Sequence, residues 1–181
     1  GLTKQGFALL EAMGDLGYSL DISHMDKKAA LQALDIYDGN LIATHANAAQ
    51  LIKNDSNRHL SNRVIEGVLE RNGVIGVVPY NLFLNAEWKK GNPRDIVPLD
   101  LVANQIDYFC QIAGNSQHVA IGSDADGGFG LQSSPIGMNS LSDLSKLVPM
   151  LSEKGYHTSD IENIFYRNWL RFLKTSLPKT L

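Results

Sequence analysis

The chain has little cysteine, no long hydrophobic run and no block of like charge. Its single cysteine, Cys110, excludes an internal disulfide and favours a reducing, cytoplasmic compartment, although a segment ahead of Gly1 could carry a signal peptide. No apolar run approaches the roughly 20 residues that span a bilayer, so no transmembrane segment is expected. Sixteen basic and nineteen acidic residues give a net charge of −3 without clustering, which excludes a typical nucleic-acid surface.

Several short catalytic motifs are also absent. No G-x-G-x-x-G follows the first strand-like run, which disfavours dinucleotide binding, and the chain has no H-E-x-x-H, G-x-S-x-G or P-loop. Asp124-Ala-Asp126 begins like a calcium loop, but Pro135 stands at the twelfth position, where an EF-hand needs glutamate. The chemistry must therefore come from residues that folding brings together.

Strand-like and helix-like segments alternate along the chain. Apolar runs predict four strands, at 18–23, 41–45, 73–79 and 118–123. Helical spacing predicts helices at 3–17, 26–37, 61–71, 99–113, 141–154 and 158–174, with loops at 46–60, 80–97 and 125–139. Thr3, Asp26 and Ser61 are predicted to cap their helices, and Thr158 or Ser159 the last one.

This alternation implies parallel strands and an α/β fold. Four consecutive βα units, followed by C-terminal helices, fit either a small doubly wound sheet or the second half of a (β/α)8 TIM barrel. A complete barrel typically needs about 250 residues, so 181 residues cannot close one alone. We expect residues 1–181 to form one domain, with Cys110 as a buried structural thiol in a helix.

Polar side chains stand where each strand-like run ends. His24 and His45 close the first two runs, Tyr80 follows the third and Asp124 follows the fourth. The carboxyl ends of parallel strands meet at one edge, and imidazole and carboxylate are usual zinc ligands, so a metal or catalytic site is expected there. The alternative is that the two histidines are hydrogen-bonded wall residues. Ordinary structural roles are expected for the remaining histidines, His59, His118 and His157.

Short blocks spread through nearly the whole chain follow the order of a known family. They are Gly1-Leu-Thr3, Asp21-Ile-Ser-His24, Thr44-His45-Ala-Asn-Ala48, Asn57-Arg58-His-Leu-Ser61, Gly73-Val-Ile-Gly-Val77, His118-Val-Ala-Ile-Gly-Ser-Asp124-Ala-Asp-Gly127 and Arg167-Asn-Trp-Leu-Arg171. Together they resemble the second half of the membrane dipeptidase (renal dipeptidase) family, which are zinc metallopeptidases of the amidohydrolase type.

The resemblance implies a binuclear zinc site in the complete protein and the hydrolysis of dipeptides. His24 and His45 match two histidines that ligate the second zinc, and Arg58 matches an arginine that binds the terminal carboxylate of the substrate. Asp124 matches a strand-end aspartate that handles protons, and Asp126 is a weaker, structural candidate. A hydroxide shared by the two metals attacks the peptide carbonyl in this mechanism.

Two further residues, Tyr80 and Asn81, fall where the family lines its substrate pocket. The family's remaining metal ligands, an H-x-D pair and a bridging glutamate, belong to an N-terminal half that is absent here. We therefore expect the chain to need that half, as part of a longer polypeptide or of an assembly, and the family favours a homodimer. The other interpretations are an N-acyl amino acid hydrolase or deaminase on the same barrel, or a non-catalytic α/β domain that binds a small ligand.

Overall fold

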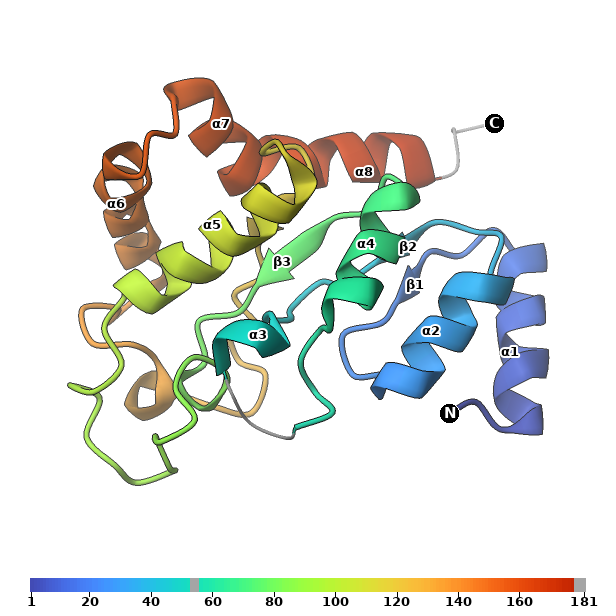
Figure 1. Ribbon diagram of the computed structural model, residues 1–181, viewed down its shortest axis with the longest axis horizontal. Helices are drawn as coiled ribbons and strands as arrows, with labels where there is room; N and C mark the ends of the chain where they lie inside the picture. Colours follow the sequence, from blue (N-terminus) through green and yellow to red (C-terminus); the bar gives the residue numbers. More distant parts are fainter. Residues whose placement is uncertain (53–55, 178–181) are drawn as a thin grey trace.

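Four short parallel strands run through the centre of the fold in sequence order (Figure 1). The computed structural model describes residues 1–52 and 56–177. Its strands are β1 (Leu20–Asp21), β2 (Leu41–Ile42), β3 (Ile75–Val77) and β4 (Val119–Ile121). β1 pairs with β2 and β3 with β4, and a parallel bridge from Ala43 to Ile75 joins the two pairs. The described strands therefore follow the order 1-2-3-4, without the reversal that defines a doubly wound sheet. The parallel α/β prediction is confirmed.

Helices follow the strands in the predicted alternation. They are α1 (Lys4–Asp15), α2 (Lys27–Ile36), α3 (Ala49–Ile52), α4 (Asn62–Glu70), α5 (Asp100–Ala113), α6 (Leu147–Glu153), α7 (Thr158–Glu162) and α8 (Asn168–Ser176). Helix α2 packs against α4, and α4 against α5, while α5 also contacts β3 and β4 (Figure 1). No helix in the described part of the chain is long and apolar enough to cross a membrane.

The helix ends follow local side-chain chemistry. The Thr3 hydroxyl accepts a hydrogen bond from an amide in the first turn of α1, and the Asp26 carboxylate accepts two in α2, as predicted. Ser61 stands at the N-cap of α4 but makes no capping bond with its side chain. Helix α5 ends at Gly114, whose φ of 67° is the left-handed conformation that glycine adopts without strain.

The structure differs from the predicted elements in the loops and at the C-terminus. The loop predicted at 46–60 contains α3, and that at 80–97 begins with the 3-10 turn η1 (Asn81–Phe83). The helix predicted at 141–154 starts as the 3-10 helix η3 (Leu141–Lys146), because the ring of Pro149 is incompatible with α-helical geometry four residues earlier. The loop predicted at 125–139 contains the 3-10 turn η2 (Leu131–Ser133).

The last predicted helix, 158–174, is interrupted. A π-helical turn, η4 (Asn163–Arg167), separates α7 from α8. The N-cap of α7 is His157 rather than Thr158 or Ser159. The Asp160 carboxylate accepts a hydrogen bond from the His157 backbone amide at 3.1 Å, which fixes the first turn one residue earlier. The π-helical turn packs on β4 and completes the cover of that strand.

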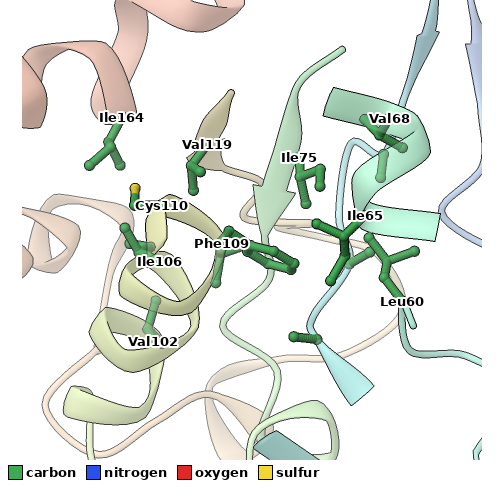
Figure 2. Packing of buried hydrophobic residues seen from close by; sticks show 14 of the residues in the cluster. Leu60, Ile65, Val68, Ile75, Val102, Ile106, Phe109, Cys110, Val119 and Ile164 are labelled. Atoms are coloured by element: carbon green, nitrogen blue, oxygen red, sulfur yellow. The ribbon is translucent and has the colours of Figure 1, made fainter. Parts of the chain in front are cut away.

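The hydrophobic core lies between the strands and helices α4 and α5 (Figure 2). Phe109 of α5 is fully buried, and its ring points toward Ile75 of β3 and Ile65 of α4 in this view. Cys110 is buried beside Ile106, as predicted, and burial raises the pKa of its thiol to about 12. This packing fixes the strands from their helical side and so sets where their carboxyl ends lie.

Candidate metal and substrate site

Two imidazoles meet at the ends of the first two strands. His24 follows β1 and His45 follows β2, and their Nε2 atoms lie 2.8 Å apart. The ring centroids are 4.9 Å apart, with an angle of 58° between the ring planes. His24 is exposed and His45 half-buried, so the pair faces open space. The structure thus brings together the two nitrogens that the sequence predicts as metal ligands.

A hydrogen-bonded network supports this pair from β1. The Asp21 carboxylate accepts the Ser23 hydroxyl at 2.6 Å, the Thr44 amide at 3.1 Å and the Thr44 hydroxyl. The Thr44 oxygen in turn lies 2.7 Å from Nδ1 of His45. Burial alone would raise the pKa of Asp21, but the hydrogen bonds from Ser23 and Thr44 outweigh it and lower that pKa. Asp21 is therefore ionised at neutral pH.

Two glycines let the backbone before His45 approach the neighbouring strands. A Cβ atom at Gly76 would lie 2.1 Å from the Thr44 carbonyl oxygen, and one at Gly122 would lie 1.9 Å from the same atom. Real Cβ atoms do not approach an oxygen so closely, so any side chain at either position would displace Thr44. Gly76 in β3 and Gly122, directly after β4, thus set the position of the second histidine.

Arg58 reaches the same site from the loop after α3. Its Nη2 donates to the His45 carbonyl oxygen at 2.8 Å, and its guanidinium carbon lies 4.8 Å from the centroid of the Phe83 ring. Its Nε and Nη1 are buried and have no hydrogen-bond partner among the described residues. Burial lowers the pKa of Arg58, yet a guanidinium remains charged at physiological pH. The site therefore holds a cation with two free donors.

Asp124 follows β4 in an uncommon conformation. Its φ is 47°, in the left-handed region, and a Cβ at Gly127 would lie 2.2 Å from its carboxylate. Its charge is close enough to act on both His45 and Arg58. Burial lowers the pKa of His45 despite the attraction of Asp124, so its imidazole is held neutral, the form that binds metals. Asp126 also has a positive φ, 69°, and is exposed.

The loops after β3 and β4 are tied together beside the site. Tyr80 stacks on Phe129, with centroids 4.4 Å apart, and meets the edge of Phe83 at 4.8 Å. Arg94 donates to three backbone carbonyls within residues 134–138. Asn81 is fully buried, and neither atom of its amide has a partner among the described residues. Tyr80 thus contacts the ring of Phe83, on which Arg58 packs, while Asn81 lies beneath the surface.

Three residues near the site were not singled out by the sequence. The Phe83 ring packs against the Arg58 guanidinium, and the Phe129 ring stacks on the Tyr80 ring. His59, expected to be an ordinary loop residue, is only 5% exposed, and its ring meets the edge of Phe83 at 5.2 Å. The signal that could have found the two phenylalanines is the presence of large aromatic residues in otherwise polar loops.

The donor set can be compared with what a metal requires. Zinc sites in proteins use imidazole nitrogens with neutral rings, which the paired Nε2 atoms of His24 and His45 can supply. Within residues 1–52 and 56–177, no group of three or more His, Cys, Asp or Glu side chains is placed to hold a metal. The described residues thus fit two ligands of a zinc ion and do not form a complete site.

The fold and this site define an α/β protein with paired strand-end imidazoles. Residues 1–178 match the family described as Membrane dipeptidase (Peptidase family M19). The chain therefore belongs to the membrane dipeptidase family, which comprises metallo-dipeptidases. A Klebsiella pneumoniae protein described as an uncharacterized protein in the pqqA 5′ region is 33% identical over 96% of this chain and 60% of its own length. Dipeptidase tcpJ of Claviceps purpurea is 26% identical over 96% of this chain and 38% of its own.

Solved structures agree with this assignment. A metallo peptidase from Rhodobacter sphaeroides, liganded with a phosphinate mimic of the dipeptide L-Ala-D-Ala, matches with a TM-score of 0.80 and 26% identity over 98% of this chain and 48% of that chain. Dipeptidase AC of family M19 matches with a TM-score of 0.83 and 27% identity, over 97% and 49% of the two chains. The chain thus spans about half the length of the relatives it matches.

Proposed function

We propose that this chain forms the second half of a TIM-barrel zinc dipeptidase and carries part of a binuclear site. His24 and His45 would hold one zinc, Arg58 would bind the terminal carboxylate of a dipeptide, and Asp124 would take and return the proton. The observation that carries this proposal is the convergence of the two Nε2 atoms beside a half-buried arginine whose Nε and Nη1 have no partner among the described residues. Family membership supports it.

The unpaired donors of Arg58 favour an anionic substrate. Burying a charged donor without a partner costs free energy, and an anion that accepts from Nε or Nη1 reduces that cost. A carboxylate can accept two parallel hydrogen bonds from one edge of the guanidinium, where Nη2 is paired with either Nε or Nη1. Dipeptides and N-acyl amino acids carry such a group, whereas the substrate of a deaminase need not. The site therefore favours the two amide hydrolases over the deaminase.

Asp124 is our candidate for handling the proton, and the action of its charge on both His45 and Arg58 supports this role. The missing side chain at Gly127 leaves room for that carboxylate, because a Cβ there would lie 2.2 Å from it. When bound, zinc would polarise the scissile carbonyl and make water nucleophilic at neutral pH. Arg58 and Tyr80 would orient the substrate, and Asp124 would deliver the proton to the departing amine.

A dipeptide with a D-residue at its C-terminus is the first substrate to test. A relative of 26% identity binds a mimic of L-Ala-D-Ala, and this chain covers 48% of that relative's length. The active protein is therefore expected to contain the N-terminal half, and experiments should use the protein in its natural full length.

Three compounds separate the candidate functions: L-Ala-D-Ala, its C-terminal amide, and N-acetyl-D-alanine. We expect hydrolysis of the dipeptide, a kcat/KM for its amide lower by roughly 10-fold to 150-fold, and little turnover of the N-acetyl compound. The range corresponds to the roughly 1.5–3 kcal/mol of a hydrogen bond to a charged group. Preference for N-acetyl-D-alanine would instead identify an N-acyl amino acid hydrolase.

Matched variants test the residue roles. Arg58→Lys should lose the same factor on the dipeptide but little on the amide, whereas Arg63→Lys, at an exposed residue of α4, should lose nothing on either. A double His24→Ala, His45→Ala variant should contain less zinc than the wild type. Unchanged zinc content in that variant would refute the ligand assignment and leave the non-catalytic binding domain as the better interpretation.

A further inference from the structure

The hydroxyl of Thr44 connects a carboxylate to a predicted metal ligand. It has a single hydrogen, and two acceptors compete for it: Oδ2 of Asp21 and Nδ1 of His45. An ionised carboxylate has no hydrogen of its own, so its short contact with the Thr44 oxygen requires the threonine to be the donor. The remaining contact, 2.7 Å between that oxygen and Nδ1 of His45, then requires a hydrogen on the imidazole.

Ser23 does not offer a way around this assignment. Its hydroxyl donates a hydrogen bond to the Asp21 carboxylate, with 2.6 Å between the two oxygens. The Ser23 oxygen in turn accepts a hydrogen bond from the backbone amide of His45 at 3.0 Å. The 3.3 Å contact between the hydroxyl oxygens of Ser23 and Thr44 thus needs no hydrogen. All hydrogens of the network point toward Asp21, and the only arrangement that satisfies each contact protonates Nδ1 of His45.

We propose that Asp21 and Thr44 are positioning residues that hold His45 as its Nδ1–H tautomer and thereby present Nε2 as a zinc ligand. This inference rests on the proposed function. Histidine ligands commonly donate their other ring hydrogen to a carboxylate or another acceptor, which fixes the ring and increases its basicity. Here the carboxylate acts through one threonine hydroxyl.

His24 provides an internal comparison. In the described part of the chain its only side-chain hydrogen bond is the one from Nε2 to Nε2 of His45. With His45 lacking a hydrogen on Nε2, His24 must supply it in the metal-free protein. To bind a metal through Nε2, His24 would have to move its hydrogen from Nε2 to Nδ1, while His45 is already in its binding form. The two predicted ligands therefore differ in tautomer: in the metal-free protein Nε2 of His45 has no hydrogen, whereas Nε2 of His24 has one.

The test is nitrogen NMR of the histidine rings in metal-free full-length protein, together with zinc titration. Wild-type His45 should be the Nδ1–H tautomer. Thr44→Val keeps the shape but removes the hydroxyl, so His45 should shift toward the Nε2–H tautomer and zinc affinity should fall by roughly 10-fold to 100-fold. Thr44→Ser, which restores the hydroxyl, should match the wild type in both measurements. In both measurements, Asp21→Asn should give values between those of the wild type and those of Thr44→Val.

An Nε2–H tautomer in wild-type His45, or a tautomer and zinc affinity unchanged by Thr44→Val, would overturn the proposal. Failure of the proposed function would look different. In that case the wild type would bind no zinc, and the ring spectrum would still decide the direction of the hydrogen bonds. Thr44→Ser behaving like Thr44→Val would also refute the proposal, because it would show that the methyl packing matters rather than the hydroxyl.

Discussion

Burial of His59 predicts that the protein loses stability when the pH falls below neutrality. The side chain is 5% exposed, packs against Phe83 and has no hydrogen-bond partner at Nδ1 among the described residues. Burial, and then the positive charge of Arg58, lower the pKa of His59 to about 4. Protonation of this ring would place a second cation beside a buried guanidinium, so the folded state resists it.

The sign and size of the effect follow from linkage. In the unfolded chain the histidine titrates near 6.5, whereas in the folded protein it titrates near 4. Above the unfolded value both states are neutral and the folded state bears no penalty. As the pH falls through this window only the unfolded state binds the proton, so the free energy of unfolding decreases. The gap between the two values corresponds to roughly 3 kcal/mol.

The measurement is urea unfolding of metal-free protein at several pH values between 4 and 8, followed by tryptophan fluorescence. His59→Gln is the matched control, because glutamine is polar but cannot take up the proton. The wild-type free energy of unfolding minus that of the variant should be constant above about pH 7 and should decrease by roughly 3 kcal/mol by about pH 4. Carboxylates contribute equally to both proteins and cancel. A difference that stays constant over the whole range would refute the reasoning.

Three further predictions concern the fold and the site. Thr3→Ala should lower the free energy of unfolding by about 1 kcal/mol in urea denaturation, while Thr3→Ser should not, because the capping hydroxyl is kept. Phe109→Ala should cost about 3–5 kcal/mol in the same assay, because it empties the centre of the core. Gly122→Ala should weaken zinc binding by roughly tenfold or more, measured by titration, because the new Cβ displaces Thr44; wild-type affinity would show that the strands can shift to accept it.

The alternation of elements could be predicted because each strand is a short apolar run and each early helix has a recognisable cap. Thr3 and Asp26 cap through their own side chains, so their effect is local and visible in the sequence. The interruption at η4 could not be predicted, because the residues there have ordinary helical propensity and the π-helical turn packs on β4. Tertiary packing, rather than local preference, decides that segment.

The meeting of His24 and His45 could be predicted for a similar reason. Neighbouring parallel strands bring their carboxyl ends together, so two strand-end residues become neighbours whatever lies between them. The direction of the hydrogen bonds that Asp21 accepts could not be predicted, because it depends on side-chain rotamers. Nor could the burial of His59, which lies in a polar stretch and is covered by a loop far along the chain.

The stacking of Tyr80 on Phe129, together with the bonds from Arg94 to residues 134–138, has a consequence for protein engineering. These contacts join the loop after β3 to the loop after β4, so each loop stabilises the conformation of the other. A chimera that receives only one of the two loops from a relative would lose that support on both sides. Substrate preference should therefore be transferable between family members only when both loops are exchanged as one module, and recombination libraries should place their crossover points outside the pair.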